Sequence, residues 1–117
     1  MKKFLIVFSL VFLTACTGNL TDNLSNKVDC NEMKDLVEEE AILIDVRTKE
    51  EYADGHLEGS INMDSTTIMN DIETKIPDKD TKIVVYCRSG NRSSSTLKKL
   101  KEKGYTNVYD LGSISNC

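Results

Sequence analysis

The fold is decided by the stretch Tyr86-Cys87-Arg88-Ser89-Gly90-Asn91-Arg92-Ser93, which joins an apolar, β-branched run at 83–85 to a segment with helical spacing at 94–103. A strand that ends at a cysteine, turns through a glycine and enters a helix points its backbone N–H groups inward. Such a turn is a nest for an anion, which the helix dipole reinforces. With Arg88 and Arg92 among the five residues that follow it, Cys87 is expected to ionise more easily than a free thiol, because these neighbours favour the thiolate. A cysteine that is merely buried at a strand end is the simpler alternative, but the two arginines and the glycine favour a reactive thiol.

Segments of strand and helix character alternate on both sides of this stretch. The expected strands are 41–44, 60–63, 82–86 and 107–111, and the expected helices are 30–39, 49–52, 65–76 and 94–103. A capping box of Asp29 and Glu32 begins the first helix, Thr48 caps the second, and Asp64 or Ser65 caps the third. This alternation predicts an α/β fold with a parallel sheet that is covered on both faces.

The carboxyl ends of parallel strands meet at one edge of a sheet, where α/β proteins place their functional residues. Asp45 and Arg47 follow the strand expected at 41–44, and Cys87 follows the strand expected at 82–86. We therefore expect the three residues at the same edge, with Asp45 and Arg47 supporting the site through an ion pair or loop hydrogen bonds.

The chain begins with the features of a secretory signal. Lys2 and Lys3 precede a run at residues 4–13 that is apolar but for one serine and is too short to span a bilayer. The residues Leu13-Thr14-Ala15-Cys16 resemble a bacterial lipoprotein box, in which cleavage leaves a lipid-modified cysteine at the new N-terminus. The resemblance implies a lipoprotein signal peptide at 1–15, a lipid on Cys16, and a protein exported and anchored to a bacterial membrane in the cell envelope or periplasm.

The next segment, residues 16–27, is polar and without periodicity, and predicts a flexible tether ahead of one domain at 28–117. The net charge is −4, and removal of Lys2 and Lys3 with the signal peptide takes it to −6. This acidic balance argues against nucleic acid as a partner. We expect the domain to work as a monomer, attached to the membrane only through the lipid.

The four cysteines have different expected roles. Cys16 is assigned to the lipid, which leaves Cys30, Cys87 and Cys117 in an oxidising compartment. A Cys30–Cys117 disulfide with Cys87 free, a resolving role toward Cys87 for either of the other two, and two unpaired thiols are the open alternatives. The chain has no CxxC pair, so it supports neither thioredoxin-like exchange nor a metal site.

Two motifs together resemble the signatures of the rhodanese family, the thiosulfate sulfurtransferase-like domains. The first comprises Leu43-Ile44-Asp45-Val46-Arg47-Thr48, Glu51-Tyr52, Gly55-His56-Leu57 and Gly59-Ser60-Ile61-Asn62. The second, residues 85–93, matches the active loop of single-domain members. The resemblance covers nearly all of 28–111 and implies a rhodanese-like three-layer α/β/α fold, with a five-stranded parallel sheet in the strand order 3-2-4-5-1.

The resemblance also implies a function. Cys87 is the implied catalytic residue: it accepts a sulfane sulfur from a small anionic donor such as thiosulfate, becomes a persulfide and passes the sulfur to a thiol or cyanide-like acceptor. Thiolate attack expels an anion, which cations and N–H groups stabilise, so neither a metal nor an organic cofactor is needed. Arg92 is also able to brace the loop. The expected substrate-binding residues are Arg88, Ser89, Gly90, Asn91, Arg92 and Ser93.

Loop length separates two kinds of enzyme with this scaffold. Four residues lie between Cys87 and Arg92, the spacing that the family associates with sulfur chemistry, whereas phosphatase and arsenate-reductase relatives have five. His56 is the only histidine, and we expect a structural role for it, since an ionised thiolate needs no base. The alternatives are a persulfide carrier with little turnover of its own and a redox protein that uses Cys87 with Cys117.

The C-terminal residues depart from the family pattern. Many members continue through a Gly-Gly turn into an aromatic residue and a further helix, whereas this chain continues as Gly112-Ser113-Ile114-Ser115-Asn116-Cys117. Short chain ends are commonly disordered, and we expect the same here. A Cys117 thiol that receives sulfur from Cys87 or forms a disulfide with it is the alternative.

Overall fold

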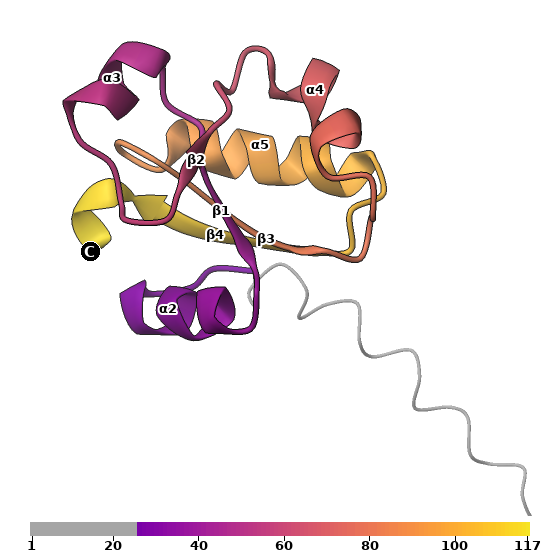
Figure 1. Ribbon diagram of the computed structural model, residues 1–117, viewed down its shortest axis with the longest axis horizontal. Helices are drawn as coiled ribbons and strands as arrows, with labels where there is room; N and C mark the ends of the chain where they lie inside the picture. Colours follow the sequence, from indigo (N-terminus) through magenta and orange to yellow (C-terminus); the bar gives the residue numbers. More distant parts are fainter. Residues whose placement is uncertain (1–25) are drawn as a thin grey trace, which may run out of the picture.

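The structure is a computed structural model that describes residues 26–117, so the predicted signal peptide, Cys16 and most of the predicted tether lie outside the described residues. Strands and helices alternate along the chain as the sequence predicts (Figure 1). The strands are β1 (Ile42–Asp45), β2 (Ile61–Asn62), β3 (Lys82–Cys87) and β4 (Asn107–Ser113). The helices are α2 (Cys30–Glu38), α3 (Lys49–Asp54), α4 (Ile68–Lys75), α5 (Asn91–Glu102) and the 3-10 helix η2 (Ile114–Asn116).

The strands form one parallel sheet in the order β2-β1-β3-β4. The expectation of five strands is wrong for the described residues, because the fifth position, beside β4, holds only a single bridge between Lys27 and Asp110. The Asp110 N–H donates to the Asn26 carbonyl at 2.7 Å, and the Val28 N–H donates to the Asp110 carbonyl at 3.0 Å. The extended segment ends there because Asp29 already caps α2. The last two residues of the predicted tether are thus paired with the sheet.

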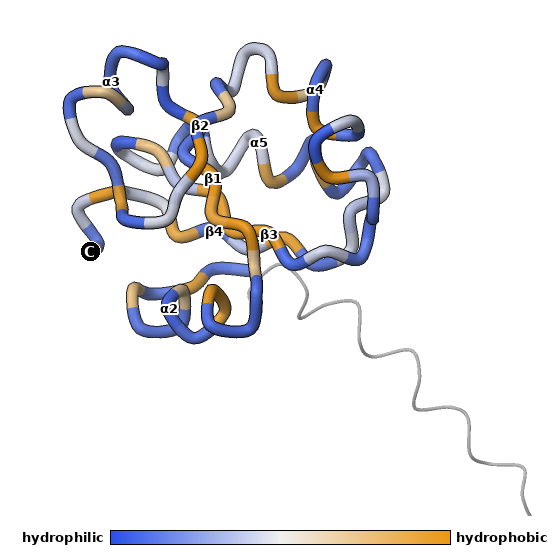
Figure 2. The backbone as a smooth tube through the Cα atoms, viewed as in Figure 1, coloured by the Kyte–Doolittle hydropathy of each residue, from blue (hydrophilic) through white to orange (hydrophobic). Residues whose placement is uncertain are grey.

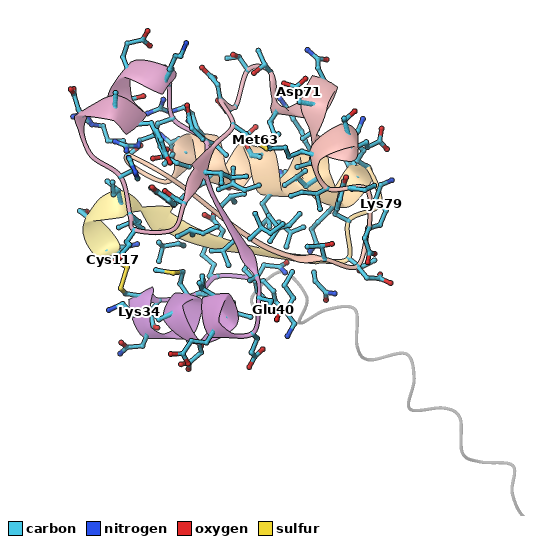
Figure 3. The ribbon with its side chains drawn as sticks, in the orientation of Figure 1. Lys34, Glu40, Met63, Asp71, Lys79 and Cys117 are labelled. Atoms are coloured by element: carbon cyan, nitrogen blue, oxygen red, sulfur yellow. A yellow bond between two sulfur atoms is a disulfide. The ribbon has the colours of Figure 1, made fainter. Side chains whose placement is uncertain are left out.

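Helices cover both faces of the sheet (Figure 1). Buried side chains of α4 and α5, such as Ile72, pack on one face, and those of α2, such as Met33, pack on the other. The side chains of β3 alternate between the two clusters: Val85 belongs to the first, and Val84 and Tyr86 belong to the second. Figure 2 shows hydrophobic residues along the central strands and largely hydrophilic residues along the helices, and Figure 3 shows side chains filling the layers. Burial on both faces fixes the position of β3, and with it the start of the loop that follows.

The predicted capping box at Asp29 and the predicted cap at Thr48 are both present, and the cap at Thr48 is also a full capping box. At the start of α2 the Asp29 side chain accepts from the Glu32 N–H, and at the start of α3 the Thr48 hydroxyl accepts from the Glu51 N–H. In each box the glutamate carboxylate accepts a hydrogen bond from the N–H of the cap residue, so two backbone donors are satisfied at the start of each helix. Within residues 26–117 no helix combines the length and the apolar character that a bilayer span requires.

The other two helices begin elsewhere than predicted. Neither of the residues expected to cap α4 does so: the Asp64 carboxylate accepts from the Thr66 N–H at 2.9 Å, in a turn that precedes the start of α4 at Ile68. α5 begins at Asn91, three residues earlier than the expected start at 94. Gly90 permits this early start because its φ of 100° lies in the left-handed region, which favours glycine.

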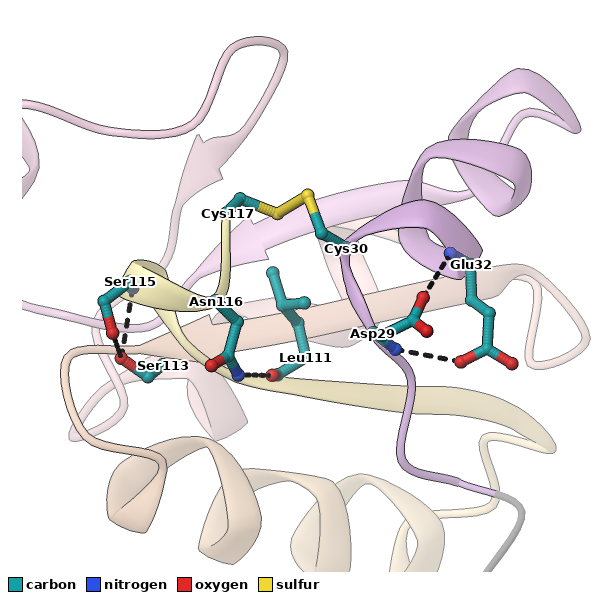
Figure 4. Close-up of a disulfide and its surroundings, with 8 residues drawn as sticks. All are labelled: Asp29, Cys30, Glu32, Leu111, Ser113, Ser115, Asn116 and Cys117. Carbon is teal, nitrogen blue, oxygen red and sulfur yellow. Dashed lines mark hydrogen bonds between the residues drawn. A yellow bond between two sulfur atoms is a disulfide. The ribbon is translucent and has the colours of Figure 1, made fainter.

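The C-terminal tail is ordered, so the expectation of a disordered end is wrong. η2 follows β4 directly, and Cys117 forms a disulfide with Cys30 of α2, 87 residues away in sequence (Figures 3 and 4). Of the three alternatives for these cysteines, the Cys30–Cys117 pair is confirmed. Pairing of Cys87 with Cys117, a resolving role for Cys30 or Cys117, and two unpaired thiols are all contradicted, since Cys87 is the free, buried cysteine of the described residues.

Candidate active site

The carboxyl ends of three adjacent strands bring the predicted site residues together. Asp45, at the end of β1, lies opposite Tyr86 of β3, and Cys87, the last residue of β3, lies opposite Ser113 of β4. Cys87 and Asp45 are both 0% exposed. The expectation that Asp45 and Cys87 share one edge of the sheet is therefore confirmed.

The sulfur of Cys87 is held in a cradle of hydrogen-bond donors formed by residues 88–93. The Gly90 N–H donates to Sγ at 3.0 Å, and the Ser93 N–H donates at 3.4 Å. The Ser93 hydroxyl lies 3.6 Å from Sγ and also donates to the Gly90 carbonyl at 3.2 Å. Because a hydroxyl has one proton and rotates freely, Ser93 accepts from a thiol and can turn its proton toward a thiolate. The cradle thus suits both protonation states of the sulfur.

Two opposing effects act on the pKa of Cys87. Burial of the thiol raises its pKa, whereas hydrogen bonds from the Ser93 hydroxyl and from the N–H groups of Ser93, Gly90 and Arg92 lower it. The hydrogen bonds outweigh burial, so the pKa lies below that of an ordinary cysteine. The thiolate, which is the nucleophilic form, is therefore stabilised without any neighbouring base.

Arg92 braces the loop through a partner that sequence reasoning missed. Its two terminal nitrogens donate to the two carboxylate oxygens of Glu51 at 2.8 and 3.2 Å. The hydrogen bond from Arg92 is the largest of several effects that lower the pKa of Glu51 to about 2, and the paired carboxylate in turn raises the pKa of Arg92. Glu51 lies within the first signature motif, but nothing in the sequence links it to a residue 41 positions later.

The remaining loop residues form the rim of the cradle. Arg88, Ser89 and Asn91 are exposed, whereas Ser93 at its base is buried. Across residues 26–117 no carboxylate forms an ion pair with Arg88, so this cation is exposed and unpaired. The expected binding residues therefore divide into sulfur contacts at the base and an unpaired cation at the surface.

Asp45 and Arg47 form the ion pair that the sequence predicts. The guanidinium contacts both carboxylate oxygens, with the shortest distance, 2.7 Å, from Nη2 to Oδ2. Arg47 also donates to the Gly55 carbonyl at 2.6 Å, and its pKa is raised chiefly by the hydrogen bond to Asp45. Asn62 donates to the carbonyls of both residues. This pair therefore fixes the turn after β1 rather than contacting the sulfur.

His56 has the structural environment that we expected. Its ring stacks on Tyr52 with centroids 3.7 Å apart, and its Nδ1 lies 2.8 Å from the Tyr52 carbonyl oxygen. The same segment is held by the Tyr86 hydroxyl, which accepts from the Leu57 N–H at 3.0 Å and contacts the Ser60 hydroxyl at 3.1 Å. These contacts hold the turn that contains the glycine–histidine pair of the first motif.

The arrangement is suited to nucleophilic chemistry by a thiolate. One buried sulfur faces several N–H donors, and the loop carries two cations: Arg92, which is paired with Glu51, and Arg88, which is exposed. In the part of the chain that the structure describes, no three His, Cys, Asp or Glu side chains are grouped as a metal would require. A cysteine in an amide cradle at the carboxyl edge of a parallel α/β sheet, with four residues between it and the loop arginine, is the arrangement that the resemblance to the rhodanese class predicts.

The comparison with known families agrees with this class. Residues 29–116 match the family model of the Rhodanese-like domain, which is well over half of the chain. The protein therefore belongs to the rhodanese-like family, and it is a rhodanese-type enzyme.

The chain is also similar in sequence and in structure to individual members of the family. The chain is 37% identical over 73 residues to thiosulfate sulfurtransferase PspE of Escherichia coli (strain K12), covering 62% of this chain and 70% of PspE. It is 34% identical over 76 residues to thiosulfate sulfurtransferase GlpE of Pseudomonas fluorescens (strain SBW25), covering 65% of this chain and 68% of GlpE. Among solved structures, a rhodanese with anions from E. coli has a TM-score of 0.63 and 35% identity, over 66% of this chain and 91% of that one.

Proposed function

We propose that the protein is a sulfurtransferase that carries a sulfane sulfur on Cys87 as a persulfide. The supporting observation is the cradle: donors converge on Sγ and lower the pKa of the thiol. The relatives named above are thiosulfate sulfurtransferases, so thiosulfate is the donor proposed here.

The proposed reaction has two steps. The Cys87 thiolate attacks the outer sulfur of thiosulfate, the S–S bond of thiosulfate breaks, and sulfite leaves with the bonding electron pair. The product is the Cys87 persulfide anion, so one negative charge stays on the enzyme. An acceptor, either a thiolate or cyanide, then attacks the outer sulfur and regenerates the Cys87 thiolate.

Each group of the loop has a part in these steps. The exposed cation of Arg88 attracts the dianionic donor and stabilises the departing sulfite. The N–H groups that now contact Sγ stabilise negative charge on the sulfur. The four-residue spacing between Cys87 and Arg92 is the one that the family resemblance associates with sulfur chemistry. Every cradle donor comes from residues 88–93, so the site is complete within one chain, which supports action as a monomer.

Mass spectrometry of the purified protein after treatment with thiosulfate tests the proposal. We expect an increase of about 32 Da, one sulfur atom, on the Cys87 peptide, which cyanide then removes. Cys87→Ser should abolish both the adduct and the formation of thiocyanate. Ser95→Ala, on the exposed side of α5, is the matched control and should behave as the natural protein. A natural protein that takes up no sulfur would refute the proposal.

We also propose that the protein is exported and attached to a bacterial membrane through a lipid on Cys16. The support is the sequence alone: a basic start, a short apolar run and the Leu13-Thr14-Ala15-Cys16 box. The N-terminal peptide of the protein isolated from membranes should begin at a lipid-modified Cys16. Cys16→Ala should release the protein from the membrane fraction, and a variant that stays membrane-bound would contradict the proposal.

A further inference from the structure

Ser113 places a hydroxyl directly on the backbone of the cradle loop. Its Oγ donates to the carbonyl oxygen of Arg88 at 2.6 Å. Ser113 Oγ also accepts from the Ser115 N–H at 3.1 Å and lies 2.7 Å from the Ser115 hydroxyl. A serine hydroxyl has one proton, and here it is used on Arg88, so the Ser115 hydroxyl is the donor in the other contact. The hydrogen-bonding capacity of Ser113 Oγ is therefore full, which fixes its orientation.

An irregularity in the pairing of β3 with β4 brings this hydroxyl to the loop. Val85 pairs with Asp110, but the register then shifts, and Cys87 pairs with Ser113. Regular pairing would put Gly112, which has no side chain, opposite Cys87. The Asp110 carboxylate accepts from the Gly112 N–H at 2.8 Å and holds the irregular segment in place. The shift of one residue thus replaces a glycine with a hydrogen-bond donor beside the cradle.

The tail that holds Ser113 is attached to the fold at both ends. On one side it continues from β4, and on the other the Cys30–Cys117 disulfide ties it to the first turn of α2 (Figure 4). Between these points the Cys117 N–H donates to the Ile114 carbonyl at 3.2 Å, and the Asn116 side chain donates to the Leu111 carbonyl at 2.8 Å. η2, which supplies both Ser115 contacts to Ser113, is therefore closed by the disulfide.

The bond from Ser113 orients a peptide group of the cradle. In a trans peptide the carbonyl and the following N–H point to opposite sides. Holding the Arg88 carbonyl toward Ser113 therefore also sets the direction of the Ser89 N–H. The next peptide along supplies the Gly90 N–H, which donates to the Cys87 sulfur at 3.0 Å. A rotation at Arg88 would change the alignment of the donors that follow it.

We infer that Ser113 is a positioning residue for the Cys87 cradle and that the Cys30–Cys117 disulfide holds Ser113 in place through η2. The effect of this positioning on sulfur transfer rests on the proposed function, whereas its effect on the reactivity of the Cys87 thiol does not. Loss of either element lets the Arg88–Ser89 peptide rotate, so the cradle stabilises the thiolate less well.

A double-mutant cycle on the full chain tests the inference. The rate of alkylation of the Cys87 peptide by iodoacetamide is measured against pH, beside persulfide formation from thiosulfate. Ser113→Ala should slow alkylation near neutral pH about three- to tenfold, the effect of one hydrogen bond, and shift the pH profile upward. The double variant Cys30→Ser/Cys117→Ser should have a similar effect. Ser113→Ala added to that double variant should change the rate by less than about twofold, because both changes act through one contact.

Two controls separate positioning from stability. Ser113→Thr keeps the hydroxyl and should restore the natural pH profile. Ile76→Val, buried just after α4 on the face of the sheet that α4 and α5 cover and without a hydrogen bond to the cradle, should lower stability and leave the profile unchanged. The inference would be overturned if the effects of Ser113→Ala and of Cys30→Ser/Cys117→Ser on the alkylation rate multiplied in the combined variant. It would also be overturned if Cys30→Ser/Cys117→Ser alone left the alkylation rate unchanged. If the natural protein takes up no sulfur but the alkylation cycle is non-additive, the proposed function fails and the inference stands.

Discussion

Two sulfur sites lie at the same end of the molecule and are held in opposite ways. The Cys87 sulfur is buried, reduced and surrounded by N–H groups from the six residues that follow it. The Cys117 sulfur belongs to an exposed residue and is bonded covalently to a residue 87 positions away. The cradle leaves the Cys87 sulfur free to react and lowers the pKa of its thiol. The disulfide leaves Cys117 without a free thiol and constrains the chain.

This difference assigns separate physical roles to the cysteines. Hydrogen-bond donors around Cys87 act on the equilibrium between thiol and thiolate, and they matter for chemistry. The Cys30–Cys117 bond closes a loop of almost the whole domain, and it matters for stability. Changes at the disulfide should therefore appear mainly in unfolding measurements and affect the pH profile only through Ser113, whereas changes in the cradle should appear mainly in pH profiles. The hydrogen bond from Ser113 to Arg88 is the place where the two sites meet.

The largest expected effect concerns stability. Cys30→Ser/Cys117→Ser should lower the free energy of unfolding by close to 5 kcal/mol, because the disulfide restricts the unfolded chain over a loop of this length. Cys87→Ser should change it by about 1 kcal/mol or less, since it exchanges one small buried group for another. Urea unfolding of both variants, followed by circular dichroism, measures the difference. Equal losses would remove the distinction between the two sites.

The turn after β1 is not held by a disulfide and depends on the ion pair of Asp45 and Arg47. Asp45→Asn should cost about 3 kcal/mol, because it leaves the buried guanidinium of Arg47 without a charged partner. The double variant Asp45→Asn/Arg47→Met removes the buried charge and should recover part of this loss. If the double variant is less stable than the single one, the unpaired charge is not the cause. Thermal unfolding of the two variants decides the matter.

The pH profile of Cys87 is the next expected effect. Ser93→Ala removes a donor that lowers the pKa of the thiol, so this pKa should rise and less thiolate should be present at neutral pH. A hydrogen bond to a charged group contributes roughly 1.5–3 kcal/mol, so alkylation at neutral pH should slow about tenfold or more. Measured against pH, the alkylation curve should move to higher pH. An unmoved curve would show that backbone donors alone set the pKa.

The smallest expected effect lies at the brace of the loop. Glu51→Gln should lower the free energy of unfolding by less than about 1 kcal/mol, because the pair with Arg92 is partly exposed. The folded-state pKa of Glu51 is about 2, below the ordinary value of 4.5. Its contribution is therefore complete above about pH 4.5 and is lost as the pH falls through 2. Acid titration of the variant and of Glu50→Gln, an exposed neighbour, isolates this contribution, and identical curves for the two would contradict it.

What the sequence predicted depends on the distance between the interacting residues along the chain. The cradle of Cys87 and the pair of Asp45 with Arg47 involve residues at most six positions apart, where strand, turn and helix geometry fix the positions. Helix caps are equally local: the capping box at Asp29 and the cap at Thr48 were predicted, although the box that Glu51 completes at Thr48 was not. The alternation of locally determined strands and helices also predicted the parallel sheet, although its paired strands lie far apart along the chain.

The contacts that sequence reasoning missed join distant segments. Glu51 meets Arg92 across 41 positions, and Ser113 meets Arg88 across 25. The second contact depends on a register shift in β4 that no composition or spacing indicates. The cysteine count gave the Cys30–Cys117 pair only as one of three alternatives. Likewise the fifth strand was expected from the family, but the cap at Asp29 shortened it to a single bridge.

The bridge at Lys27 has a further consequence for how the domain is presented. Because it pairs in parallel with β4, the chain reaches the sheet from the amino ends of the strands. The sulfur cradle lies at the carboxyl ends, on the opposite side of the domain. If a lipid on Cys16 anchors the protein to a bilayer, the tether joins the domain at Lys27, on the side opposite the reactive thiol. Donors and acceptors that diffuse in the surrounding solution then meet the sulfur without passing between the domain and the membrane.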